Sequence, residues 1–258
     1  MVHGGRAAST AGGGAPMPTA RERNQAMTLI YLIAGISIVP LFVLGLFAHV
    51  RVRRVFARRL QEPTKKGLTG SRLARTMLNA SGLNDVLIEE VEPNLADHYD
   101  PSRKVVRLSR NVARSSSVAA IGIAAHEAAH AIQDGSNFTA VRIRNGMAPI
   151  VQKAAFFILP LLFLGILMGS VIATSLFVNI AVILFLGIVV FYLVTLPLEL
   201  KASSMALRYI KDNGIADEKE ITGVEEVLRA AVLTYIIAAA LAVAQFFRLL
   251  GLYRILKV

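Results

Sequence analysis

The sequence predicts a membrane protein built mainly of α-helices, with a small α+β segment on the cytoplasmic side. Of its 258 residues, 55 % are hydrophobic, and the mean hydropathy is +0.57. The hydrophobic residues gather in runs long enough to cross a bilayer, which is typical of membrane proteins. Cysteine is absent, which excludes disulfides, thiolate metal sites and a cysteine nucleophile.

The net charge of +11 raises the question of nucleic-acid binding. Lys and Arg, however, cluster beside the hydrophobic runs and do not form a basic face with interleaved aromatic residues. We therefore attribute the charge to membrane topology and expect no nucleic-acid partner.

The chain begins with a polar tail and a first apolar run. Residues 1–26 are rich in Gly, Ala, Ser, Thr and Pro and are predicted to be disordered. Residues 27–48 are uncharged, and at 1.5 Å per residue they extend about 33 Å, enough for a bilayer core of about 30 Å. A cleaved signal peptide is disfavoured, because the run is too long and a basic stretch, "HVRVRRVFARRL", follows it in place of a cleavage site.

Basic residues around this run predict its orientation. Three precede it, and seven follow it closely, namely Arg51, Arg53, Arg54, Arg58, Arg59, Lys65 and Lys66. This excess predicts that the segment after residue 48 is cytoplasmic. The same arginines could serve as an anchor for anionic lipids, which would also place them at the cytoplasmic leaflet.

Residues 49–147 are expected to form the cytoplasmic α+β segment. A short helix in "TGSRLARTMLNASGL" has Thr69 as N-cap and Gly82 just past its end. "DVLIEEVE" and "KVVRLS" predict two strands in a hairpin or small sheet. A second helix through "VAAIGIAAHEAAHAIQ" can be capped by the serines at 115–117 and ended by Gly135.

The rest of the chain predicts three further helical parts. Residues 148–198 form a transmembrane hairpin, because 154–198 contain no charged residue, with a turn near "GSVIATS". Residues 199–228 return to the cytoplasm, with a helix opening at Glu199 and a turn at "DNG". Residues 229–258 contain a fourth apolar helix. Spanning is favoured over a position on the membrane surface, although it leaves three basic residues outside, against the charge rule.

The stretch "AAHEAAHAIQD", residues 124–134, carries the chemistry. On a helix, His126 and His130 lie about 40° apart on one face, so both imidazoles can converge on one ion. Zinc prefers such ligands, and Glu127 can reach a water molecule as general base. The alternative is polar packing between helices. The H-E-x-x-H pattern and the small residues around it favour zinc.

A third zinc ligand must be a histidine or a carboxylate, since there is no cysteine. His3 and His49 are poorly placed, His98 in the predicted hairpin loop is possible, and Glu199 directly after the third span is better placed. Glu199 could instead pair with Lys201 at the interface.

Three runs in order, "DHYDPSRKVVRLS", "AAHEAAHAIQD" and "LPLELKASSMAL", resemble the YugP-like neutral zinc metallopeptidases, a bacterial membrane family. The resemblance covers roughly residues 66–247. It implies a zincin-like metallopeptidase domain of the glutamate type, in which His126, His130 and Glu199 bind one Zn²⁺ ion and Glu127 is catalytic. The layout is also similar to HtpX-type membrane peptidases, where a transmembrane hairpin separates H-E-x-x-H from the ligand glutamate.

Two positions depart from these patterns. Ala129 precedes the second histidine, where many relatives in the wider clan have glycine, and this affects packing only. Ser203 stands four residues after Glu199, where HtpX-type enzymes have aspartate, which leaves the partner of one histidine open.

Supporting roles can be assigned to three more features. Asp134 lies one turn beyond His130 and could accept its second N–H, or it could face solvent. Tyr235 could donate to the tetrahedral oxyanion, or bond a backbone carbonyl. The "KVVRLS" strand is expected to be the open edge to which an extended substrate adds.

The expected function is therefore a zinc-dependent metalloendopeptidase that hydrolyses peptide bonds with water activated by zinc. It is expected to be a multi-pass protein of the cell membrane with its site on the cytoplasmic side, acting on peptides or membrane proteins. An intramembrane zinc protease would need an aspartate ligand, which the spans lack. A zinc-binding or transport protein would not need Glu127, and a structural scaffold would bind no zinc.

Overall fold

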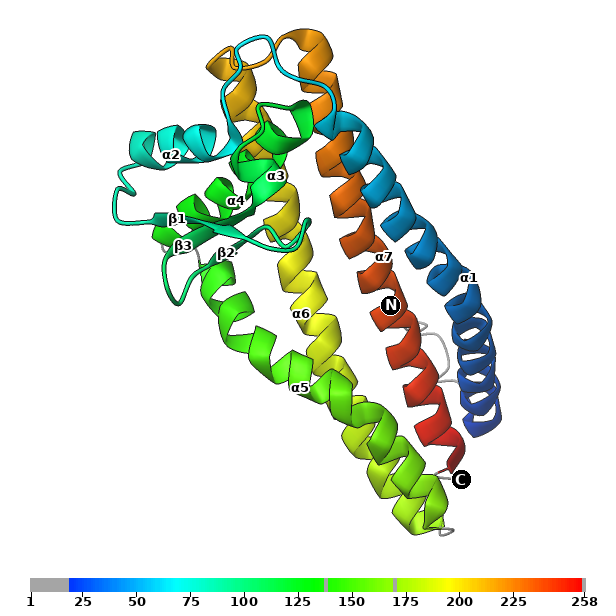
Figure 1. The fold of residues 1–258 in the computed structure, drawn as a ribbon. Coiled ribbons are helices and arrows are strands. Elements are labelled where there is room, and N and C mark those ends of the chain that lie inside the picture. Colours follow the sequence, from blue (N-terminus) through cyan, green and yellow to red (C-terminus); the bar gives the residue numbers. More distant parts are fainter. Residues whose placement is uncertain (1–18, 137–138, 169–170, 257–258) are drawn as a thin grey trace, which may run out of the picture.

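Four long helices form the body of the molecule, and a small head with a sheet sits at one end of them (Figure 1). The structure is a computed structural model that describes residues 19–136, 139–168 and 171–256. The long helices are α1 (Ala20–Leu60), α5 (Thr139–Leu167), α6 (Val171–Asp212) and α7 (Glu218–Leu256). The head contains α2 (Gly70–Ala80), β1 (Leu87–Val91), β2 (His98–Asp100), β3 (Val105–Ser109), α3 (Arg110–Ala113) and α4 (Val118–Gly135).

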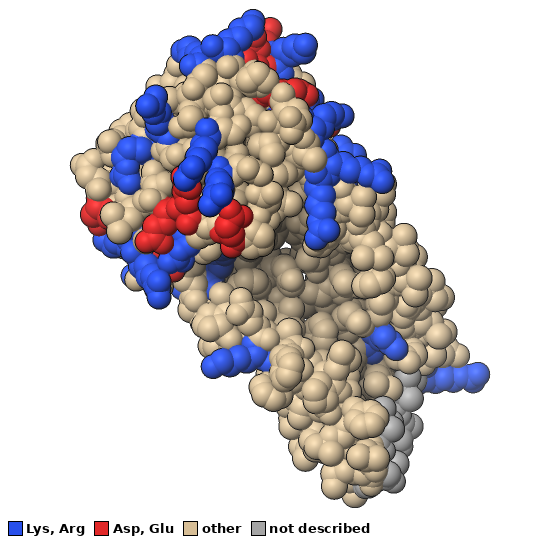
Figure 2. Space-filling view, in the orientation of Figure 1, with Lys and Arg blue, Asp and Glu red and all other residues tan. Residues whose placement is uncertain are grey.

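By length and composition, each of the four long helices could cross a membrane. Helix α1 packs along α7, and α5 packs along α6. Many large apolar side chains on α1, α5 and α6 are exposed, and apolar surface of this extent marks a contact with lipid or protein. Figure 2 shows Lys and Arg gathered over the head, whereas most of the long helices' surface is uncharged.

The first helix is longer than the sequence predicted at both ends. Helix α1 begins at Ala20, with Thr19 and Glu22 forming a capping box, so the prediction of disorder is wrong for residues 20–26. Residues 1–18 of the predicted tail lie outside the described residues. At its other end α1 includes the basic stretch, where Arg58 and Arg59 pair with Glu226 of α7 at 2.5 and 2.6 Å.

Helix α6 corrects the prediction that a new helix opens at Glu199. It runs unbroken from Val171 to Asp212, which at 1.5 Å per residue is about 63 Å, twice the bilayer core of about 30 Å. Glu199 therefore lies inside a helix that continues out of the apolar segment. The predicted "DNG" turn is present, and Gly214, at φ +55°, provides the left-handed residue that such a turn favours.

The sheet corrects the prediction of an open edge at "KVVRLS". The strand order is β1-β3-β2, with β1 parallel and β2 antiparallel to β3. The two predicted strands thus form no hairpin, because the chain makes the short strand β2 on the far side of β3 before it enters β3. Strand β3 is central and mostly buried. Strand β2 is an edge.

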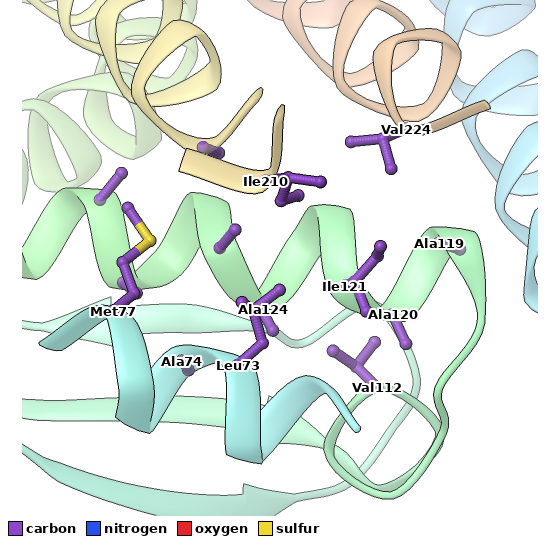
Figure 3. Close-up of a cluster of buried hydrophobic side chains, with 14 of the residues drawn as sticks. Leu73, Ala74, Met77, Val112, Ala119, Ala120, Ile121, Ala124, Ile210 and Val224 are labelled. Carbon is purple, nitrogen blue, oxygen red and sulfur yellow. The ribbon is translucent and has the colours of Figure 1, made fainter. Parts of the chain in front are cut away.

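The alanine-rich helix α4 lies at the centre of the main core (Figure 3). Leu73 and Met77 of α2 pack on one side of it, and Ile210 of α6 and Val224 of α7 on the other. A Cβ on Gly122 would lie 3.1 Å from Cγ1 of Val224, so only a small residue lets α7 approach so closely. The expectation that small residues allow tight packing of this helix is confirmed.

Candidate metal centre

Helix α4 places the two histidines one turn apart. Ser117 is its N-cap, and the serine hydroxyl accepts a hydrogen bond from the Ala120 N–H at 3.2 Å. The ring centroids of His126 and His130 are 4.7 Å apart. The two rings are therefore neighbours on one side of α4, with an angle of 85° between their planes, as the i, i+4 spacing allows.

Glu199 meets both histidines from α6. Its Oε2 atom lies 3.2 Å from Nε2 of His126 and 3.4 Å from Nε2 of His130. The two Nε2 atoms are 3.2 Å apart. The α5–α6 hairpin thus brings together ligand types that are 69 residues or more apart in the sequence (199 minus 130).

This donor set fits zinc. Two imidazole nitrogens and one carboxylate oxygen are the protein ligands typical of catalytic zinc sites, and the three atoms lie within 4.8 Å of one another. Glu199 is only 1 % exposed, and its Oε1 atom has no hydrogen bond among the described residues, with Arg144 3.5 Å away as its one ion-pair partner there. A buried carboxylate is costly unless it is paired or bound to a metal, so a cation at this point would relieve that cost.

Two side chains contact the Nδ1 atoms of the imidazoles, on the side away from Glu199, and so orient the rings. The Gln133 amide N–H donates to the Leu198 carbonyl at 3.1 Å, which points the Gln133 Oε1 atom at Nδ1 of His130, 3.1 Å away. Because Oε1 can only accept, Nδ1 of His130 carries the proton and Nε2 keeps its lone pair on the Glu199 side. Ser203 lies 3.2 Å from Nδ1 of His126.

Asp134 does not accept the second N–H of His130, which was one of its two expected roles. Its carboxylate accepts a hydrogen bond from the Tyr99 hydroxyl at 3.0 Å, which joins α4 to β2. The histidine partner is Gln133, the neighbouring residue. Sequence reasoning missed Gln133 because glutamine is a weaker candidate than a carboxylate and its side of the helix depends on where α6 lies.

Glu127 lies beside the three-ligand cluster on the buried side of α4. Burial raises the pKa of its carboxyl to about 7, and the nearby Glu199 also raises the pKa. The neighbouring His126 and the Tyr99 backbone lower the pKa of Glu127. Glu127 and His126 line one cavity together with Tyr235, so all three can meet the same bound molecule.

His98, the alternative third ligand, is not part of the cluster. It is exposed on β2, with Nδ1 2.7 Å from the Ala96 carbonyl and Nε2 3.3 Å from Arg107. Arg144 of α5, in contrast, was not expected, and its Nη2 atom lies 3.5 Å from Oε1 of Glu199. Its only sequence signal is a basic residue before an apolar run, which is also the pattern of a membrane flank.

Comparison with known proteins places these residues in a family context. The family described as "Putative neutral zinc metallopeptidase" matches residues 34–254. The "Putative membrane protease YugP" of Bacillus subtilis (strain 168) is 38 % identical over 210 residues, which are 81 % of this chain and 92 % of that protein. No solved structure gives a significant match.

Proposed function

The chain belongs to the "putative neutral zinc metallopeptidase" family, and from this premise we propose that it is a membrane-embedded zinc-dependent metalloendopeptidase. One observation carries the proposal: Oε2 of Glu199, on α6, lies 3.2 and 3.4 Å from the Nε2 atoms of His126 and His130, on α4. These three residues would hold one Zn²⁺ ion. Such an ion supplies Lewis acidity, which polarises a peptide carbonyl and acidifies water.

Glu127 is the general base in this proposal. It shares a cavity with His126 and is not one of the three ligand residues, so its carboxylate can take a proton from the attacking water. It then delivers the proton to the leaving amine, which makes it general base and general acid in turn. Tyr235 lines the same cavity, and its hydroxyl is our candidate donor to the oxygen that becomes negative.

The edge strand β2 is the element on which an extended substrate would lie. Strand β3 is covered by neighbours on both sides, whereas β2 pairs with β3 alone within the sheet. Strand β2 packs against α4, the helix that carries Glu127, and the Tyr99 hydroxyl donates to Asp134 of α4. A peptide pairing with the free side of β2 would therefore run past the catalytic carboxylate, held by its main chain regardless of sequence.

Membrane placement is part of the same proposal. The four long apolar helices cross the cell membrane, and the head lies on the cytoplasmic side, because Lys and Arg gather there (Figure 2). Helix α7 runs along α1, so it would cross with it. The site, at the level where α6 leaves its apolar segment, would then act on peptides or on membrane proteins near the bilayer surface.

The test compares zinc content and peptide cleavage for the purified full chain, Glu127→Gln and Glu199→Ala. Glu127→Gln should keep one zinc per chain and lose activity by about 10²- to 10⁴-fold, the usual contribution of a general acid–base group. Glu199→Ala should lose zinc. An active Glu127→Gln variant would favour a zinc-binding or transport protein, and full zinc in Glu199→Ala would remove Glu199 from the ligand set.

A further inference from the structure

A cavity of about 150 Å³ opens beside His126 and Glu127. It is built from α1, α4 and α7 together with the segment between β1 and β2 that carries Leu95 and Asp97. Figure 2 shows the surface hollowed between the charged head and the long helices. The walls of the cavity are mostly aliphatic or aromatic, and their apolar residues include Val52, Phe56, Leu95, Ile123, Val227, Leu228 and Ala231.

The size and lining of this cavity suit one apolar side chain. An apolar cavity of about 150 Å³ can hold a benzene-sized group. A leucine or phenylalanine side chain is of this class, whereas alanine would leave most of the space empty. No Lys or Arg lines the cavity among the described residues, so nothing there would pair with an acidic side chain.

Two carboxylates in the wall, Asp97 and Glu127, could attract Lys or Arg. Glu127 is the general base of the proposed function, and Asp97 is the other. It is already engaged, since its Oδ1 atom accepts from the Ser109 backbone N–H at 2.7 Å and from the Ser109 hydroxyl at 3.1 Å. These bonds tie the segment before β2 to the end of β3. Asp97 is therefore part of the cavity wall, and its carboxylate is not available to bind a Lys or Arg side chain.

We propose that this cavity is the specificity pocket of the enzyme, which takes a leucine- or phenylalanine-sized apolar side chain from a residue next to the cleaved bond. The inference rests on the proposed peptidase function. The position of the cavity supports this role. His126 and Glu127 form one wall, so a side chain in the cavity belongs to a substrate residue close to the reacting carbonyl. Because α1 and α7 form other walls, specificity depends on the same helices that would cross the membrane.

The test uses the zinc-loaded full chain and a series of peptides that differ only at one position beside the cleavable bond, with Ala, Leu, Phe, Lys or Asp there. Wild type should cleave the Leu or Phe peptide at least about 10-fold better than the Ala peptide, since each methylene in an apolar pocket is worth about 10- to 200-fold in kcat/KM. Lys and Asp peptides should be poorer still.

Ala231→Leu narrows the cavity from α7, and Val227→Ala widens it. Ala231→Leu should lower kcat/KM for the Leu and Phe peptides about 10-fold or more while it spares the Ala peptide. Val227→Ala should shift preference towards Phe. The matched control is Ala240→Leu, the same change further along α7, at a residue that does not line this cavity; it should leave the preference unchanged.

The results can contradict the proposed pocket without contradicting the proposed peptidase function. A wild-type preference for Lys or Asp, an equal loss on all peptides in Ala231→Leu, or an unchanged preference in both pocket variants would overturn the pocket while cleavage itself stands. Wild-type activity no higher than that of Glu127→Gln would overturn the peptidase function, and the pocket with it.

Discussion

At the scale of single residues, the candidate site depends on groups that hold the histidines as much as on the three ligands. Gln133 joins Nδ1 of His130 to the Leu198 carbonyl and so connects α4 to the turn of α6 that carries Glu199. Partners of this kind fix the tautomer and the ring orientation of a ligating imidazole. They are therefore expected to control zinc affinity without touching the ion.

Replacing Gln133 should weaken zinc binding. Gln133→Leu removes the acceptor for the His130 N–H and is expected to lower zinc affinity about 10- to 100-fold, the usual effect of such partners. Competition with a chromophoric chelator measures this directly. Asp134→Asn is the neighbouring control, because Asp134 bonds Tyr99, and it should keep normal affinity. The reverse pattern would show that Asp134 is the true partner.

Arg144 offers a second residue-scale prediction. Its guanidinium lies 3.5 Å from Oε1 of the buried Glu199, so it offsets that carboxylate charge in the zinc-free protein. Arg144→Gln should destabilise the zinc-free protein by about 1 to 3 kcal/mol, below the roughly 3–5 kcal/mol of a fully buried pair. The expected destabilisation is smaller because the Arg144 side chain is 29 % exposed, so solvent screens the ion pair. The stability lost in Arg144→Gln should be smaller in the zinc-loaded protein, because the ion then offsets the charge of Glu199.

Thermal unfolding with and without zinc checks this prediction. Arg142→Gln is the matched control, since Arg142 is exposed on the same helix, and it should change stability little in either state. Equal destabilisation of the zinc-free and zinc-loaded Arg144→Gln protein would mean that Arg144 does not act through the charge of Glu199.

At the scale of elements, the order of the strands decides which strand has a free edge for the proposed substrate. The sequence indicated that "KVVRLS" is a strand, and this is confirmed, but only the pairing shows that it is central and that β2 is the edge. Strand β2 is three residues long and lacks a strong strand pattern. Besides its backbone pairing with β3, two side-chain bonds hold this part of the chain: the Tyr99 hydroxyl donates to Asp134 of α4, and Asp97, just before β2, accepts from the Ser109 N–H at the end of β3.

Pairing with β2 can be tested from the substrate side, without altering the enzyme. Methylation of a peptide nitrogen removes one main-chain donor, so peptides methylated at the residue that pairs with β2 should show a clearly raised KM. Methylation one residue away, where the N–H points outward, should have little effect, since strand hydrogen bonds alternate in direction. Equal kinetics for a full methyl scan would rule out main-chain pairing.

At the scale of the whole molecule, the long helices and the charged head would define a direction relative to the membrane under the proposed placement. The head carries most of the Lys and Arg seen in Figure 2, and α1 starts at the opposite end of the molecule (Figure 1). The natural absence of cysteine allows single labelling sites to be introduced. Both faces can thus be probed in the intact protein.

An impermeant thiol reagent should label Lys219→Cys, at the start of α7 near the head, only in inverted membrane vesicles. Gln25→Cys, near the start of α1, should be labelled only in intact cells. Both positions are exposed. The opposite pattern would place the site outside the cell, and labelling of both from one side would mean that α1 does not cross the membrane.

Most of the helices could be predicted because their signals are local. Apolar runs marked all four long helices, and Ser117, Gly82 and the "DNG" stretch marked caps and turns. Helix ends were less certain, since α1 and α6 continue beyond their apolar segments as ordinary helix. A change from apolar to polar composition marks a change of surroundings and not the end of a helix.

The sequence by itself determined the facing pair of histidines with Glu127 between them, because a spacing of four residues on a helix sets that geometry locally. It also determined the long apolar helices, because their length and composition are properties of one segment. The tertiary structure alone decided that Glu199 and not His98 meets the histidines, that Gln133 and Arg144 support the cluster, and that β2 is the edge. These are contacts between segments far apart in the chain, and they depend on how α4, α6 and α7 pack around one small-residue core.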